Sequence, residues 1–207
     1  MASEIELKFR VHPDFEPITL FGNKKIHPYK QKTYHHYYKT FYLDTEDNYA
    51  EELGISLRLR AEDDVPYIYA KTTISRDGAL SVRKEWRIRS NNLETAADRL
   101  AFRGAPTKPL IGKKLYVTGG VIFDRMECIV TPHPGFSFIL SYDSGVFDED
   151  YGFGELEFEL REGEIEELQA LVEELRSEIF MIPEPRSKHQ RSLEYAGGKR
   201  WLLPDNI

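Results

Sequence analysis

The first residues that could do chemistry lie in a short segment near the start of the chain, EIELKFRV. Four charged residues alternate there with four apolar ones: Glu4, Glu6, Lys8 and Arg10 against Ile5, Leu7, Phe9 and Val11. Successive side chains of a β-strand point to opposite faces, so the segment predicts a strand with two acids and two bases on one face.

Three later segments repeat this separation of charged from apolar residues. Their polar faces are Ser56, Arg58 and Arg60 in GISLRLRA, Arg83, Glu85, Arg87 and Arg89 in VRKEWRIRS, and Glu155, Glu157 and Glu159 in GELEFELR. A single strand of this kind is most often the water-exposed outer face of an antiparallel sheet. Several such strands, with acids gathered on one and bases on another, instead favour a bound cation and a bound anion, because neighbouring like charges repel.

The acids point to a hard divalent cation. Carboxylate oxygens come from two segments, as Glu4, Glu6, Glu155, Glu157 and Glu159. Mg²⁺ or Mn²⁺ suits such a ligand set. Zinc is poorly supported, because Cys128 is the only cysteine and the adjacent His35 and His36 would point to opposite faces of a strand.

The bases point to a polyphosphate. The set Lys8, Arg58, Arg60, Lys71, Arg87 and Arg125 holds more positive charge than a carboxylate ligand requires. Phosphate oxygens accept both bidentate arginine and single lysine contacts. If the charged faces point inward, the strands form a polar tunnel, and helices and loops must cover the apolar outer faces.

Composition limits the class of protein. The chain has 207 residues, 41% hydrophobic, which predicts one domain over residues 1–207. Its formal net charge of -7 argues against binding to DNA. The single cysteine and the lack of an apolar leader favour the cytoplasm, and no apolar run is long enough to span a membrane.

Hydrophobic periodicity predicts a mainly antiparallel β protein with a few helices. Strands are expected at residues 4–10, 34–43, 54–61, 66–74, 81–89, 113–117, 121–131, 136–143 and 154–161. Helices are expected at NLETAADRLAFRG and at GEIEELQALVEELRSEIF, which has a continuous apolar stripe. The segment from about 12 to 33 is rich in proline and remains unassigned.

These motifs resemble the CYTH superfamily, the triphosphate tunnel metalloenzymes. EIELK is similar to the ExExK signature of that family, and the resemblance continues in order through FYLDT, LRLR, AKT, RKEWR, FDR, SYDSG, ELEFE and SKHQR. It covers nearly the whole chain. The family implies an α+β fold dominated by an eight-stranded, closed antiparallel tunnel, so one of the nine expected strands should lie outside the barrel or be incorrect.

The resemblance also implies roles for residues. Glu4, Glu6, Glu157 and Glu159 become metal ligands, and Lys8, Arg58, Arg60, Lys71, Arg87, Arg125 and Lys188 become triphosphate contacts. Glu85, Asp143 and Glu155 are either further ligands or partners that hold the bases. Glu127 stands where many members have another base, so one phosphate contact could be missing.

The implied reaction is Mg²⁺- or Mn²⁺-assisted hydrolysis of a phosphoanhydride, without a protein nucleophile. Inorganic triphosphate ranks first as substrate, because no pocket for a base is recognisable. A thiamine or RNA 5′-triphosphatase, a class IV adenylyl cyclase and a non-catalytic binder of polyphosphate or a nucleotide are the alternatives. The cyclase ranks lower because no His-Phe pair precedes Glu4. The protein is expected to be a monomer or a homodimer, to bind no membrane and to accept, at most, the 5′ end of an RNA.

Overall fold

A computed structural model describes residues 3–147 and 150–203 of the chain. One antiparallel sheet dominates this part of the chain. Its strands are β1 (Glu4–Val11), β2 (Tyr34–Asp44), β3 (Ile55–Glu62), β4 (Val65–Asp77), β5 (Leu80–Arg89), β6 (Tyr116–His133), β7 (Phe136–Phe147), β8 (Tyr151–Glu162) and β9 (Ile182–Pro183). The helices are α1 (Ile18–Phe21), α2 (Tyr49–Glu52), α3 (Ala96–Phe102), α4 (Ile165–Arg176) and α5 (Lys188–Ala196), with 3₁₀ turns at His27–Tyr29 and Lys108–Leu110.

Eight of the strands close into a barrel, which confirms the predicted fold. The order is β5-β4-β3-β2-β6-β7-β8-β1, and β1 pairs with β5 as well as with β8. β9 adds two residues to the outer edge of β1. β1 and β5 close the barrel through Glu4–Leu7 and Leu80–Arg83, and side chains alternate between the interior and the exterior along each strand.

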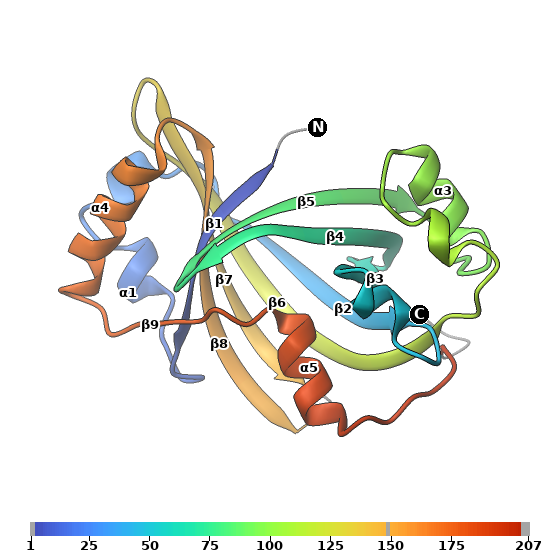
Figure 1. The fold of residues 1–207 in the computed structure, drawn as a ribbon. Helices are drawn as coiled ribbons and strands as arrows, with labels where there is room; N and C mark the ends of the chain where they lie inside the picture. Colours follow the sequence, from blue (N-terminus) through green and yellow to red (C-terminus); the bar gives the residue numbers. More distant parts are fainter. Residues whose placement is uncertain (1–2, 148–149, 204–207) are drawn as a thin grey trace.

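The apolar exterior of the barrel is covered in two places. On one side, α1 and α4 pack against the outer faces of β1, β6, β7 and β8 and form one hydrophobic core (Figure 1). On the other, α2 and α3 cover β3, β4 and β5 and form a second core. In α4 the buried residues are Leu168, Val172 and Leu175, the apolar stripe expected from the sequence. The hydrophobic cores therefore lie outside the barrel, and the interior is free to be polar.

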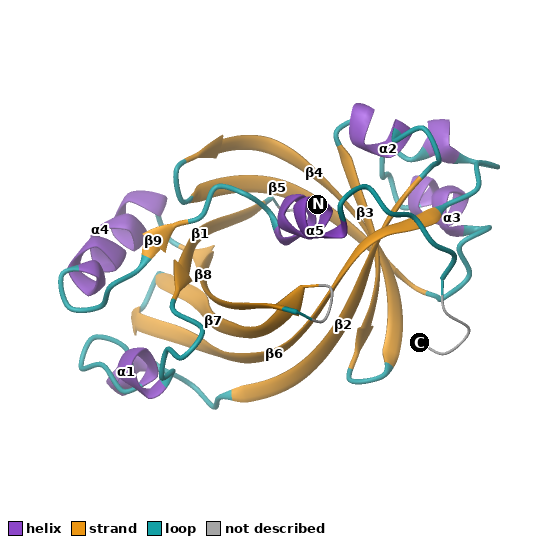
Figure 2. Cartoon of the chain, turned by 90° about the horizontal axis from the view of Figure 1, so that it is seen from below, coloured by secondary structure: helices purple, strands orange, loops and turns teal. Residues whose placement is uncertain are grey.

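The barrel interior also contains a small aromatic cluster. Tyr38, Tyr42, Val121, Phe123, Phe147 and Phe153 pack together, all buried. Phe123 lies two residues before Arg125 and Phe153 two residues before Glu155, so these rings share the inner face with the charged residues. Helix α5 packs on β6 and β7, and Figure 2 shows it near the middle of the ring of strands. The aromatic rings and α5 thus delimit the polar interior.

The secondary structure differs from the sequence prediction in three places. The strands expected at 113–117 and 121–131 form one long strand, β6, which bends at a bulge where Tyr42 opposes Gly119 and Leu43 opposes Val117. The unassigned segment contains α1 and a 3₁₀ turn. α2, α5 and β9 were not expected.

Candidate functional site

A charged cavity of about 200 Å³ occupies the barrel interior. Its ionisable lining consists of eight bases (Lys8, Arg58, Arg60, Lys71, Arg76, Arg83, Arg125 and Lys188) and five acids (Glu4, Glu6, Glu85, Glu157 and Glu159). The uncharged lining includes Tyr42, Ser56, Tyr69 and the histidine His189. The bases outnumber the acids by three, so the cavity favours an anion although the whole chain is acidic.

Strand register explains why residues distant in sequence meet here. On β1, Glu6 lies directly opposite Glu159 of β8, and Lys8 lies opposite Glu157. The closing pair of strands brings Glu4 opposite Arg83 of β5. Each of these residues occupies the polar side of its alternating segment, and barrel closure turns that side inward.

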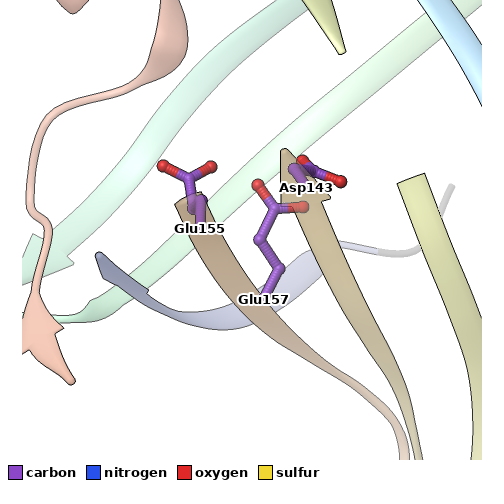
Figure 3. A group of neighbouring side chains, drawn as sticks. All are labelled: Asp143, Glu155 and Glu157. Atoms are coloured by element: carbon purple, nitrogen blue, oxygen red, sulfur yellow. The ribbon is translucent and has the colours of Figure 1, made fainter. Parts of the chain in front are cut away.

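The most compact acidic group surrounds a lysine. Asp143, Glu155 and Glu157 offer carboxylate oxygens within 4.8 Å of one another (Figure 3). The Lys188 Nζ lies 2.7 Å from Asp143 and 2.9 Å from Glu157, and it also forms an ion pair with Glu155. Arg125 binds both Asp143 and Glu157. This group is therefore already neutralised by bases.

The ionisation of this group follows from its contacts. Burial alone would raise the pKa of Glu157, but Lys188 and Arg125 hold that pKa well below its usual range. The same carboxylates outweigh the burial of Arg125 and Lys188 and raise the pKa of both bases. Glu157, Arg125 and Lys188 are consequently charged near neutral pH, whereas burial raises the pKa of Glu155. The ion pairs of Lys188 fix the start of α5 to β7 and β8.

A second network joins β1, β3, β4 and β5. Lys71 contacts Glu4 at 2.9 Å and Glu85 at 2.7 Å, and Arg58 contacts Glu85 at 3.2 Å. Arg83 pairs with Glu6 and lies 3.7 Å from Glu4. Burial opposes ionisation of Glu4, but Lys71 and Arg83 lower its pKa to about 2. These ion pairs orient the side chains before any ligand enters.

Glu159 is the exception among the cavity acids. It takes part in no ion pair or side-chain hydrogen bond with the described residues, whereas the other four acids each have a base partner. Burial, together with Glu4, Glu6 and Glu157, raises the pKa of Glu159 to about 7. Like charges directly across two strands are destabilising. A divalent cation beside Glu159 would offset this repulsion, whereas the carboxylates of Asp143, Glu155 and Glu157 already bind Lys188.

Three bases of the cavity resemble Glu159 in having no ion-pair partner among the described residues. Within residues 3–147 and 150–203, Lys8, Arg60 and Arg76 form no ion pair: Lys8 donates to the carbonyl of Arg186, Arg60 to Thr40, and Arg76 to Gln190. Burial lowers the pKa of each, and neighbouring cations add to the effect. The excess positive charge of the cavity thus resides on three side chains whose charge the protein leaves uncompensated.

His189 adds a neutral element to the lining. Its ring stacks on Tyr42, with centroids 4.5 Å apart, and its Nδ1 lies 3.0 Å from the Ser56 hydroxyl. Burial lowers the pKa of His189 to about 4, although the nearby Asp44 opposes this shift. The imidazole is therefore neutral near pH 7.

Most of the residues implicated by the sequence lie together. The lining contains Glu4, Glu6, Lys8, Arg58, Arg60, Lys71, Glu85, Arg125, Glu157, Glu159 and Lys188, while Asp143 and Glu155 lie fully buried behind it as partners of Lys188. Arg87 does not line the cavity: its side chain is 60% exposed, stacks on Tyr67 and lies 3.9 Å from Glu62. Glu127 also lies outside the lining, beside His36 and Arg125.

Among the lining residues that were not predicted from the sequence are two arginines and a histidine: Arg76, Arg83 and His189. Arg83 lies on the polar face of VRKEWRIRS, so alternation predicts that its side chain faces the interior. Alternation predicts the same for Arg87 and cannot show which of the two lines the cavity. Arg76 lies at the end of a strand beyond a register shift, and His189 lies on the helix that was not expected. These two gave no periodic signal.

A closed antiparallel barrel around a polar, base-rich interior defines a tunnel-barrel protein. The chain belongs to the CYTH family, because the model of the CYTH domain matches residues 2–192.

Solved structures share the fold. HpAC1 from Hippeastrum, described as a candidate adenylyl cyclase with a dominant triphosphatase activity, is 19% identical with a TM-score of 0.66, over 99% of this chain and 100% of that chain. A candidate adenylate cyclase from Bacillus halodurans is 17% identical with a TM-score of 0.53, over 92% and 98% of the two chains. The PH1012 protein of Pyrococcus horikoshii OT3 is 18% identical with a TM-score of 0.51, over 92% and 98%.

At these identities the similarity establishes the fold alone. No curated protein matches the sequence. None of the helices in the described part of the chain is long and apolar enough to cross a membrane.

Proposed function

We propose that this protein hydrolyses a phosphoanhydride bond of a triphosphate with the help of a divalent metal ion, and that it converts inorganic triphosphate to diphosphate and phosphate. The main support is the division of the cavity charges. Five bases are held by carboxylates, three bases have no ion-pair partner among the described residues, and Glu159 has none either. A polyanion that carries a divalent cation would compensate both kinds of unpaired charge.

The cavity residues would have two roles, binding of phosphate oxygens and binding of the metal ion. Lys8 and Arg60 would bind phosphate oxygens directly, because neither has to leave a carboxylate to do so. Arg58, Lys71, Arg83 and Arg125 would add contacts from positions fixed by their ion pairs. Glu4, Glu6 and Glu159, with Glu157 at their edge, would hold Mg²⁺ or Mn²⁺. When bound, that ion would offset phosphate charge and lower the pKa of a coordinated water.

The reaction needs no covalent intermediate on the protein. A water oxygen would bond to the terminal phosphorus, the bond from that phosphorus to the bridging oxygen would break, and the diphosphate would depart with the bridging oxygen. The water proton would pass to solvent. The fixed arginines and lysines would stabilise the charge that spreads over the phosphate oxygens in the transition state.

Inorganic triphosphate is placed first because thirteen of the twenty lining residues carry charged side chains. The few aromatic rings of the lining are already in use: Tyr42 stacks on His189, and the Arg58 guanidinium lies over Tyr69. Both tyrosine rings of the described lining therefore already have a stacking partner, and neither is committed to a base. The triphosphatase activity described for HpAC1 agrees with this ranking, while its description as a cyclase keeps the production of cyclic AMP as a second candidate.

The test is a substrate panel with matched variants. The purified protein is incubated with triphosphate, ATP, GTP, thiamine triphosphate and a 5′-triphosphorylated RNA, each with Mg²⁺, with Mn²⁺ or with excess chelator. We expect phosphate release from triphosphate, with kcat/KM at least about tenfold above ATP, and none in chelator. Turnover in excess chelator would refute the role of the metal, and cyclic AMP from ATP would refute the hydrolase.

Arg60→Met separates binding from folding. Arg60 has no ion-pair partner among the described residues, so its replacement leaves no buried carboxylate unpaired. The free energy of unfolding should therefore stay unchanged or rise slightly, while triphosphate affinity falls at least about tenfold. Arg103→Met, which removes an exposed charge from the end of α3, is the control. Equal affinity in both variants would contradict the proposed anion site.

A further inference from the structure

The β4–β5 hairpin contributes a base to the cavity that the family signature does not include. Arg76, opposite Ser81 on the paired strand, lines the same cavity as Lys8 and Arg60. Unlike those two buried residues it is exposed, so it lies at the rim. The hairpin and the segment that leads into α5 lie on the same side of the barrel (Figure 1).

Arg76 is held by a neutral partner at the first turn of α5. Its Nη1 donates to the Gln190 side-chain oxygen at 2.9 Å. The same oxygen accepts the backbone N–H of Ser187 at 2.9 Å, and the Ser187 hydroxyl accepts the N–H of Gln190. This reciprocal capping box begins the helix whose first residue, Lys188, enters the acidic group. Arg76 therefore connects the hairpin to the helix that carries a predicted phosphate contact.

The electrostatic surroundings make this contact replaceable. Arg76 has no carboxylate partner in the described chain, and burial together with the Arg83 charge lowers its pKa. A neutral amide oxygen is a weaker acceptor for a guanidinium than an anionic phosphate oxygen, because charge-assisted hydrogen bonds are roughly twice as strong. Exchange of Gln190 for a phosphate oxygen would therefore be favourable, and it would require only a side-chain movement at the rim.

We propose that Arg76 is a substrate-binding residue that leaves Gln190 when a polyphosphate enters and binds the phosphate nearest to α5. Lys8 and Arg60, buried deeper, bind the inner phosphates, so Arg76 selects for a chain of three phosphates over a chain of two. This inference rests on the proposed function for the class of ligand, and it assigns a length-determining role to one residue.

The experiment measures affinity without turnover, by calorimetry in excess chelator with inorganic triphosphate and with diphosphate as probes. Arg76→Met should weaken triphosphate binding by about tenfold and diphosphate binding by less than about threefold. Arg103→Met serves as the charge-matched control and should change both affinities equally and slightly. Circular dichroism and thermal unfolding of each variant verify that the fold is retained.

A second variant tests the exchange of partners. Gln190→Glu keeps the capping box but gives Arg76 a charged partner, so it should hold the arginine and weaken triphosphate binding. When Arg76 is already methionine, Gln190→Glu should reduce triphosphate affinity by less. The difference between the two losses of affinity measures the coupling between Arg76 and Gln190.

The outcomes separate the two proposals. If the unaltered protein binds no triphosphate either in chelator or with added Mg²⁺, the proposed function is wrong. If it binds triphosphate but Arg76→Met matches Arg103→Met, or loses diphosphate affinity equally, the role of Arg76 is refuted while the proposed function stands. Additive effects of Gln190→Glu and Arg76→Met would refute the exchange.

Discussion

Replacement of Lys188 by methionine tests whether its ammonium group neutralises the compact acidic group. The side chain of Lys188 is 8% exposed, and those of Asp143 and Glu155 are fully buried. Its removal would leave three carboxylates close together in a region of low dielectric. Breaking a buried pair by removing one partner costs about 3–5 kcal/mol. We take the lower end, about 3 kcal/mol, because Arg125 and Arg191 remain beside the same carboxylates.

Urea unfolding at pH 7 in excess chelator measures this loss directly. For a chain of this length, about 3 kcal/mol corresponds to a fall in Tm of about 6–12 °C. Lys84→Met, on the exposed side of β5, is the control and should change the free energy of unfolding by less than about 0.5 kcal/mol.

The vacated position gives a second measurement. Asp143, Glu155 and Glu157 without the lysine form a group that could hold a divalent cation. Added Mn²⁺ should therefore stabilise Lys188→Met more than it stabilises the unaltered protein, by about 2.7 kcal/mol at one hundred times the dissociation constant. A loss below about 1 kcal/mol in chelator, or equal metal stabilisation of both proteins, would refute the reasoning.

Two further predictions concern α5. The pKa of His189 is lowered from 6.5 to about 4, so the unfolded chain binds more protons between these values, and the free energy of unfolding should rise with pH from about 4 to 6.5 and then level off. His189→Asn should remove about 3 kcal/mol of this dependence, at about 1.4 kcal/mol for each pKa unit, in urea unfolding across that pH range. A curve of the same shape in the variant would exclude His189 as the cause. Gly119→Ala should displace α5 and weaken triphosphate binding, because the new methyl group would collide with Ser192. Gly152→Ala, where nothing lies near the added carbon, is the control and should bind triphosphate normally in the same calorimetric assay. Unchanged affinity in Gly119→Ala would show that triphosphate binding does not require the observed position of α5.

The barrel could be predicted because alternation is a local property. β1, β3 and β8 show polar and apolar residues in regular alternation, and β5 does so except at Lys84. This pattern gives each strand an apolar outer face and a polar inner one, as the barrel requires. β6 was divided in two because its alternation is interrupted at Gly119 and Gly120, where the partner strand β2 shifts register. A bulge depends on two strands at once, and one strand alone does not reveal it.

α5 shows a different limit. Its signals were present in the sequence: Ser187 with Gln190 three residues later forms the capping box, and Gly197 ends the helix in a left-handed conformation. The helix was missed because its inward face is polar, with Lys188, His189, Arg191 and Ser192 all buried. A search for an apolar stripe finds helices that cover hydrophobic cores, as α4 does, but not a helix that faces a charged interior.

The position of Arg87 shows what strand alternation cannot decide. Arg83 and Arg87 have the same parity on β5, so both point to the same side of the strand. The position of each arginine along the barrel depends on the facing strands: Arg83 lies opposite Glu4 of β1, whereas Arg87 lies opposite Tyr69 of β4, near Glu62 and outside the cavity lining. Those pairings join residues about 80 and 20 positions apart, so they follow from closure of the barrel and not from any local pattern.

The division between paired and unpaired bases links the fold to its proposed chemistry. Arg58, Lys71, Arg83, Arg125 and Lys188 are oriented by carboxylates, so they contribute fixed geometry at little cost in ordering when a ligand binds. Lys8, Arg60 and Arg76 are charged without such partners, and the lowered pKa of each measures a destabilisation that the folded protein bears alone. A polyanion relieves that destabilisation when it binds. The three side chains that lower the stability of the folded protein are therefore the ones that would contribute most to the binding free energy of a triphosphate. Such a loss of stability in favour of function is expected of a pre-organised site.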